Sequence, residues 1–156
     1  MGVDGMTALD IFRECGALDK KIDRIQERIE RRRALMTGCT ARPMTGDGGS
    51  MGSSDASMRM LNYVSDIEAL QADAREQEAA RDACRASCLY LADMIPDIPA
   101  GVALRHYVEH KSMTVIATEM GYSLTHVKRL KRAADDDLSG IVITYWDHVN
   151  LPVCSR

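Results

Sequence analysis

Aromatic residues and long apolar runs are both scarce in this chain. Only 4% of its 156 residues are aromatic, while 28% are charged, and this mixture favours long solvated helices over a thick globular core. No apolar run approaches ~18 residues, so we expect no membrane span. The first ten residues, MGVDGMTALD, lack a basic segment followed by an apolar one, so we expect no signal peptide. These absences favour a cytoplasmic protein.

Disulfide and metal motifs are also lacking. The five cysteines are odd in number and include no CxxC pair, which argues against a disulfide framework or a zinc ribbon. Cys84 and Cys88 share one helix face and can chelate a metal, but apolar packing is the commoner role of such cysteines. His106, Glu109 and His110 match the HxxEH pattern of some zinc proteases, which also needs a third ligand and a cleft. We therefore expect no metal site and no cofactor.

Catalytic motifs are missing in the same way. The sequence has no phosphate-binding P-loop, no GxSxG motif and no convincing pair of carboxylates, so we expect no catalytic residues and no enzyme activity. The net charge of −3 means that any attraction to nucleic acid must come from a local basic patch rather than from the whole chain.

What the sequence does contain is helical periodicity. Residues 1–36 are predicted to hold the first helix of a coiled coil, because apolar residues recur at spacings of three and four from about residue 7. This is the a/d seam of a helix that faces a partner. The seam consists of Ile11, Cys15, Leu18, Ile22, Ile25 and Ile29. Three arginines follow at residues 31–33. We interpret them as cations near the helix C-terminus, where the macrodipole favours them, with contact to DNA or polymerase as the alternative.

A loop and a second helix follow. Residues 37–57 contain five glycines and a proline, which predicts a flexible loop. Residues 58–95 are predicted to form a long helix, so that the two helices make an antiparallel hairpin or half of a coiled-coil dimer. Pro96 and Pro99 then end this helix. Its seam consists of Met60, Tyr63, Ile67, Leu70, Ala74, Gln77, Arg81, Cys84, Cys88, Leu91 and Ile95.

Residues 100–140 are predicted to form a helix-turn-helix domain. We expect a supporting helix over residues 101–111 and a second helix over residues 113–120. The Ser112 hydroxyl can cap the second helix by accepting a hydrogen bond from a free amide. A third helix begins after the turn, at Ser123.

The spacing of small and apolar residues supports this motif. Ile116 and Ala117 lie on the inner face of the second helix, and the small Ala117 lets the next helix cross closely. Gly121 follows four residues later, where a tight turn needs a left-handed residue. Val127 and Leu130 then cover the inner face of the third helix.

The outer face of the third helix is basic. Four Lys or Arg residues fall within residues 123–132, and the next acid is Asp135. A helix fits the major groove, so the residues early in it are predicted to reach base edges, together with Arg129. The lysines and the last arginine are predicted to contact phosphates. The predicted DNA-binding residues are Ser123, Thr125, His126, Lys128, Arg129, Lys131 and Arg132.

Residues 104–138, LRHYVEHKSMTVIATEMGYSLTHVKRLKRAADDDL, resemble the sigma-70 region-4-type helix-turn-helix of phage-encoded transcriptional activators of the RinA/ArpU-like group. The resemblance covers most of residues 7–138, including the RPMTGDGGSMGSSD stretch. It implies binding to promoter DNA and activation of late or structural phage genes, in the cytoplasm of a bacterial host. Two features depart from the pattern. Val115 and His126 stand where the family tends to carry Glu or Gln, and residues 141–156 are unusually apolar.

The sequence as a whole predicts an all-α protein with an N-terminal helical hairpin and a C-terminal helix-turn-helix domain. We predict a sequence-specific transcriptional regulator of phage or prophage origin whose partners are double-stranded DNA, RNA polymerase and, as a homodimer, a second copy of itself. The alternatives are a small-terminase-like DNA-packaging protein and a coiled-coil adaptor that binds protein. Residues 141–156 form an apolar tail, either a short strand or a segment that docks on the arm or on a second subunit.

Overall fold

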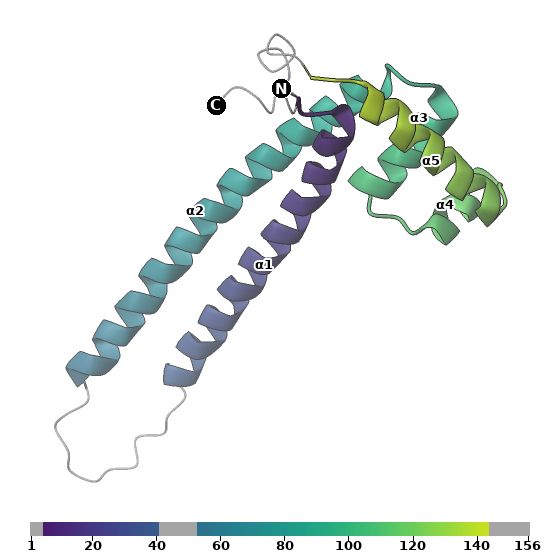
Figure 1. Ribbon diagram of the computed structural model, residues 1–156. Helices are drawn as coiled ribbons and strands as arrows, with labels where there is room; N and C mark the ends of the chain where they lie inside the picture. Colours follow the sequence, from purple (N-terminus) through teal and green to yellow (C-terminus); the bar gives the residue numbers. More distant parts are fainter. Residues whose placement is uncertain (1–4, 41–52, 144–156) are drawn as a thin grey trace. The chain divides into compact units, whose positions relative to one another are not determined.

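The computed structural model describes residues 5–40 and 53–143. Within these ranges all the named elements are helical, which confirms the all-α prediction (Figure 1). They are α1 (Ala8–Thr40), α2 (Ser53–Ala92), α3 (Asp97–Ala103), the π-helical turn η1 (Leu104–Val108), α4 (Met113–Met120) and α5 (Leu124–Gly140). Among the described residues, no helix carries an apolar stretch that is long enough to cross a membrane.

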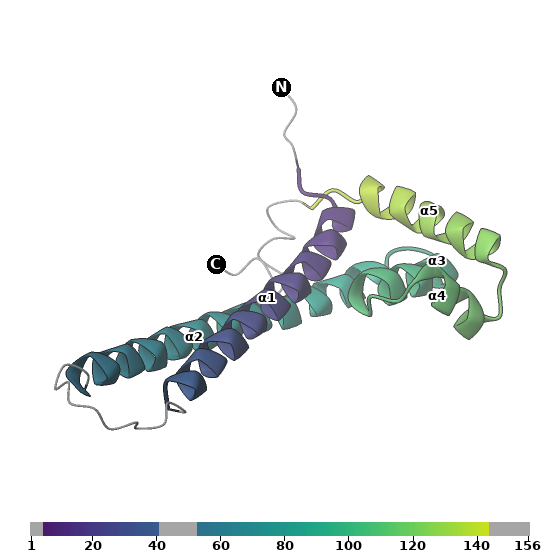
Figure 2. The ribbon, with the colours of Figure 1, turned by 90° about the horizontal axis from the view of Figure 1, so that it is seen from below.

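The chain divides into two compact units. The core unit consists of Met1–Asp19 and Ala79–Arg156, and the arm unit consists of Lys20–Glu78. Helices α1 and α2 each contribute to both units (Figures 1 and 2).

The arm unit is held together by the predicted seam. Ile25 and Ile29 of α1 and Ala74 of α2 are buried, and Ile67 and Leu70 pack against them. A cross-helix contact adds to this packing, because the Arg32 guanidinium lies 3.3 Å from the Asp66 carboxylate and 5.8 Å from the centre of the Tyr63 ring. The apolar stripe of a heptad pattern therefore meets its partner within the same chain.

The arginine run of residues 31–33 lies inside α1 rather than at its end. Arg31 pairs with Glu27 at 3.2 Å, and Arg33 pairs with Glu30 at 2.9 Å. Helix α1 continues to Thr40, and the macrodipole acts only over the last turn. The interpretation of this run as a C-terminal dipole contact is therefore wrong, and the arginines form ion pairs along and between helices instead.

Helical structure covers both ends of the segment predicted to be a loop over residues 37–57. Helix α1 includes Thr37, whose hydroxyl donates to the carbonyl of Arg33 at 3.1 Å, so this residue is accommodated within the helix. Helix α2 begins at Ser53 with Asp55 in its first turn, where a carboxylate stabilises the free amides. The remainder of the predicted loop lies outside the described residues.

The second long helix and the supporting helix also have different bounds from those predicted. Helix α2 ends at Ala92 rather than at residue 95. Pro96 is the N-cap residue of α3, and Pro99 lies in its first turn, where the missing amide of a proline removes no helical hydrogen bond. The supporting helix therefore begins at Asp97, before residue 101. It ends in the wider turn of η1.

The core unit encloses one large apolar cluster. It combines the first turns of α1, the last turns of α2, and residues of α3 and α5. Phe12 is fully buried there, and its ring meets Tyr107 edge-on at 6.0 Å between centroids. The largest other fully buried members of the cluster are Ile11, Leu91 and Leu138.

The described part of the C-terminal tail docks on the start of α1. The amide of Ala8 donates to the carbonyl of Ile141 at 2.9 Å, and the amide of Ile143 donates to the carbonyl of Met6 at 2.8 Å. Thr7 and Val142 form a single antiparallel bridge. Ile143 is buried in the core cluster. Residues 141–143 therefore pair with the chain at the start of α1, within the core unit, and the rest of the tail lies outside the described residues.

Candidate nucleic-acid interface

Two serine caps define the starts of α4 and α5. The Ser112 hydroxyl accepts a hydrogen bond from the amide of Val115 at 3.3 Å, as predicted. The Ser123 hydroxyl does the same for the amide of His126 at 3.2 Å. Each cap satisfies one amide that a helix start would otherwise leave free. The apolar side chain of Val115 has no group to complete the reciprocal half of a capping box.

The turn between α4 and α5 has the left-handed residue that the sequence predicts. Gly121 has φ 69° and ψ 28°, a conformation that costs other residues ~1–2 kcal/mol. The amide of Tyr122 donates to the carbonyl of Ala117 at 3.0 Å, which closes the helix end. Beneath the turn, Ile116 and Val127 are fully buried together with Val102 of α3. The inner faces of both helices are therefore where the apolar spacing puts them.

Four of the predicted DNA-binding residues form one exposed stripe on α5. They are Thr125, Lys128, Arg129 and Arg132, spaced three, one and three residues apart. Residues at this spacing lie on one face of a helix. We call these four residues the basic stripe. Ser123 is exposed at its N-terminal end, and His126 is half-buried beside it.

Lys131 stands apart from the basic stripe. Its ammonium group donates to the Tyr107 hydroxyl at 3.1 Å and to the Asp135 carboxylate, and it lies 5.2 Å from the centre of the Tyr107 ring. Burial opposes the charged form, but the hydrogen bonds to Asp135 and Tyr107 outweigh it and raise the pKa of Lys131. The Tyr107 hydroxyl in turn donates to Asp135 at 3.0 Å. The charged side chain of Lys131 is therefore paired within the fold and is not part of the exposed stripe.

Tyr122 joins the site, although it is not among the DNA-binding residues predicted from the sequence. Its ring meets that of His126 edge-on at 4.9 Å between centroids. The Arg129 guanidinium donates to Nδ1 of His126 at 2.9 Å, which requires that nitrogen to be unprotonated. The three side chains therefore support one another at the start of α5. Because Tyr122 precedes Ser123, the N-cap residue of α5, helical spacing could not have indicated this contact.

The N-terminal half of α5 is the favourable half for an anion. The amides in the first turn of a helix and its macrodipole attract phosphate groups, and the basic stripe adds three formal positive charges on the same side. Asp136 and Asp137 are exposed in the second half of the helix. An approaching polyanion is therefore attracted to the start of α5 and repelled from its end.

A charged cluster fixes the segment that precedes α4. Asp19 is largely buried and lies 3.7 Å from Arg81, 3.3 Å from Arg85 and 2.6 Å from Nε2 of His110. His110 has a positive φ of 54°, which a non-glycine residue adopts only when its surroundings hold it there. The Asp19 contact supplies that restraint.

The HxxEH residues do not assemble a metal site. Nδ1 of His106 lies 3.3 Å from the carbonyl of Lys111, while His110 binds Asp19. The two rings therefore have separate partners. Glu109 pairs with Lys111 at 2.7 Å. Within the described ranges, these residues are not among the groups whose ligand atoms converge.

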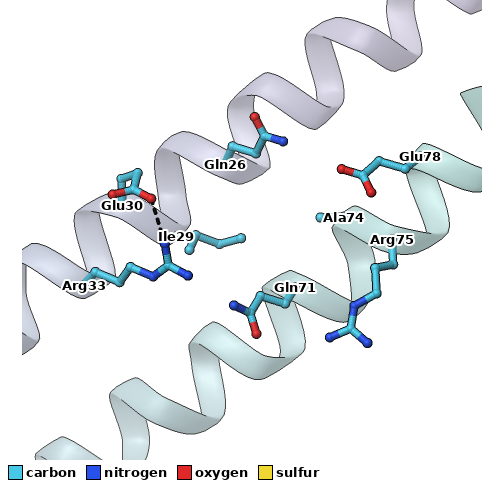
Figure 3. Close-up of a pocket in the computed structure, with 8 residues that line it drawn as sticks. All are labelled: Gln26, Ile29, Glu30, Arg33, Gln71, Ala74, Arg75 and Glu78. Carbon is cyan, nitrogen blue, oxygen red and sulfur yellow. Dashed lines mark hydrogen bonds and ion pairs between the residues drawn. The ribbon is translucent and has the colours of Figure 1, made fainter.

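The arm unit has an open groove along its two helices (Figure 3). Its lining is mainly amide and charged side chains, and Glu30 and Arg33, both on α1, form an ion pair along that helix at 2.9 Å. This is the composition of a solvated coiled-coil face. The lining residues are Gln26, Ile29, Glu30, Arg33, Gln71, Ala74, Arg75 and Glu78.

Comparison with known proteins identifies no relative. No protein-family model matches the chain, and no curated protein or solved structure matches it.

Proposed function

We propose that this chain is a sequence-specific, double-stranded-DNA-binding transcriptional regulator that inserts the start of α5 into the major groove. The observation that carries the proposal is the basic stripe, four exposed residues aligned on one face of a helix that begins at a tight glycine turn. A recognition helix in a helix-turn-helix protein reads bases with residues near its N-terminus. The stripe begins in that first turn, at Thr125.

Within this proposal the stripe residues have different tasks. Arg129 is held by His126, and a guanidinium fixed in this way suits bidentate hydrogen bonding to a guanine. Lys128 and Arg132 neutralise phosphates and set the register of the helix on the duplex. Thr125 contacts the base edges at the N-terminal end of the stripe.

The resemblance to phage activators of the RinA/ArpU-like group extends the proposal. In it the chain acts as a homodimer in the cytoplasm of a bacterial host, activates transcription with RNA polymerase, and uses its long helices as the contact for a partner. The acidic overall charge is compatible with this function, because the stripe is a local patch on a chain of net charge −3.

The test is selection of bound fragments from genomic DNA, followed by affinity measurements on the selected site and on random duplex. Arg129→Ala is expected to cost ~1–3 kcal/mol on the selected site and to relax its preference over random DNA. The matched control is Arg75→Ala, which removes an exposed arginine from the arm unit and should leave both affinities unchanged.

Two outcomes would contradict the proposal. Absence of binding to any duplex at low salt would favour the protein-binding adaptor, because several cationic contacts give a steep salt dependence. Equal losses on selected and random DNA with Arg129→Ala would show that Arg129 contacts phosphate and not bases.

A further inference from the structure

Three cysteine side chains meet in the interior of the core unit. Cys15 comes from α1, and Cys84 and Cys88 come from adjacent turns of α2. All three are fully buried, and their sulfur atoms lie within 4.8 Å of one another. The heptad seams account for the burial of these positions. They do not require sulfur at all three adjacent positions, since any small apolar residue would fill the seam.

Two of the three thiols make weak hydrogen bonds to one backbone carbonyl. Cys84 Sγ donates to the carbonyl oxygen of Ile11 at 3.3 Å, and Cys88 Sγ does so at 3.9 Å. A thiol is a weak donor, so an ion that binds sulfur has little to displace. The ion would bind the thiolate form, and the thiol protons would be released on loading.

A paired charge borders the cluster. Arg85 follows Cys84 in α2 and pairs with Asp19 at 3.3 Å. Its Nε atom is buried and has no hydrogen-bond partner among the described residues. Because Asp19 already balances the charge of Arg85, the three sulfurs themselves are the groups that would hold a cation.

We propose that Cys15, Cys84 and Cys88 form a closed site for a soft, thiophilic metal ion that takes three sulfur ligands, of which Cu(I) is the representative. A metal bound at ~2.3 Å from each of three sulfurs in a plane needs sulfur separations of ~4.0 Å. The sulfur atoms lie within 4.8 Å of one another, so their separations exceed this spacing by at most about 0.8 Å. This site is separate from the basic stripe and does not depend on DNA binding.

The ligand set selects among metals. Soft thiolates favour Cu(I), zinc and iron–sulfur centres. Structural zinc requires four ligands, and among the described residues no fourth His, Cys, Asp or Glu ligand atom joins the three sulfurs. A three-coordinate soft ion therefore fits better than zinc. Because the sulfurs are inaccessible in the folded chain, loading would accompany folding or local opening.

The experiment uses the full chain with Cys39→Ser and Cys154→Ser, which leaves the cluster as the only source of thiols. This protein is refolded without oxygen in the presence of Cu(I) and a competing chromophoric chelator. We expect one Cu(I) per chain, X-ray absorption showing sulfur neighbours only, and a rise in the unfolding temperature, since an ion that binds only the folded state stabilises it.

Two comparisons make the proposal refutable. Cys15→Ala in the same background should abolish stoichiometric binding, and circular dichroism will establish that this variant is folded. If it does not fold, Cys88→Ala serves as the second variant. Zn(II) should bind at least ~100-fold more weakly than Cu(I), because the three-sulfur site offers no fourth ligand to zinc. Absence of Cu(I) binding to the three-cysteine protein, full binding to the folded alanine variant, or equal affinity for Zn(II) would each overturn the assignment.

Discussion

Lys128 and Lys131 lie three residues apart on α5, and the structure predicts opposite consequences when each is replaced. We consider Lys→Met at each position, because methionine keeps much of the side-chain length and removes only the charge. Lys128 is exposed on the basic stripe, whereas the Lys131 side chain is only 26% exposed and pairs with Asp135, itself 22% exposed.

The loss of stability with Lys131→Met follows from the contacts that disappear. The change removes hydrogen bonds to Asp135 and to the Tyr107 hydroxyl and leaves a half-buried carboxylate without its cation. A hydrogen bond to a charged group contributes ~1.5–3 kcal/mol, and partial exposure reduces this. We expect a loss of ~1–2 kcal/mol, a decrease in Tm of roughly 2–8 °C for a chain of this size. Lys128→Met should change stability by less than ~0.5 kcal/mol.

DNA binding should respond in the opposite way: Lys128→Met should change the salt dependence of the affinity, and Lys131→Met should not. Each phosphate contact contributes ~0.9 to the slope of log affinity against log salt concentration, so Lys128→Met should reduce the slope by about that amount. Lys131→Met should leave it unchanged at temperatures where the variant is folded. Urea denaturation and a salt titration on one duplex are the two assays. If Lys131→Met leaves stability intact and reduces the slope, Lys131 is a DNA contact and its assignment to the interior is wrong.

Three further predictions concern the scaffold. Gly121→Ala should reduce the free energy of unfolding by ~1–2 kcal/mol because of the positive φ of this residue, whereas Gly140→Ala, with open space around it, should not; thermal unfolding distinguishes them. Ile25→Ala should cost ~2–4 kcal/mol by leaving a cavity in the arm unit, and a helical circular dichroism signal that melts as in the parent would contradict this. Asp19→Asn should cost ~1–2 kcal/mol because Arg81, Arg85 and His110 lose the carboxylate that they contact, with the exposed Asp93→Asn as a control that should melt like the parent.

The elements predicted best from the sequence were those with a local physical cause. The seam of α1 follows from spacings of three and four, and the turn before α5 follows from one glycine whose backbone angle suits no other residue as well. The bounds were predicted less well because helix ends depend on competing local contacts. Pro99 looks like a helix breaker in sequence, yet it is tolerated in the first turn of α3.

The candidate site was only partly predictable for a different reason. A basic residue on a predicted helix can be assigned to a face by its spacing, but partners from segments that are remote in sequence cannot be read from that spacing. Asp135 is a local partner of Lys131 at i, i+4, whereas Tyr107 lies 24 residues before Lys131, and nothing in the local pattern indicates that a phenol lies beside the ammonium group. The aligned positions of the basic stripe were predicted correctly as exposed because helical spacing alone determines them.

The basic stripe and the cysteine cluster both lie in the core unit, but they depend on different parts of the structure. The basic stripe needs only one helix whose inner face is anchored, and Val127 provides that anchor. The cysteine cluster needs two helices in register, and the seam of α1 and α2 provides it. A change of register by one seam position would separate Cys15 from Cys84. A metal bound to the cluster would therefore favour the present register of α1 against α2 over the alternatives. A metal-dependent rise in the unfolding temperature would therefore report on the pairing of α1 with α2, independently of whether α5 contacts DNA.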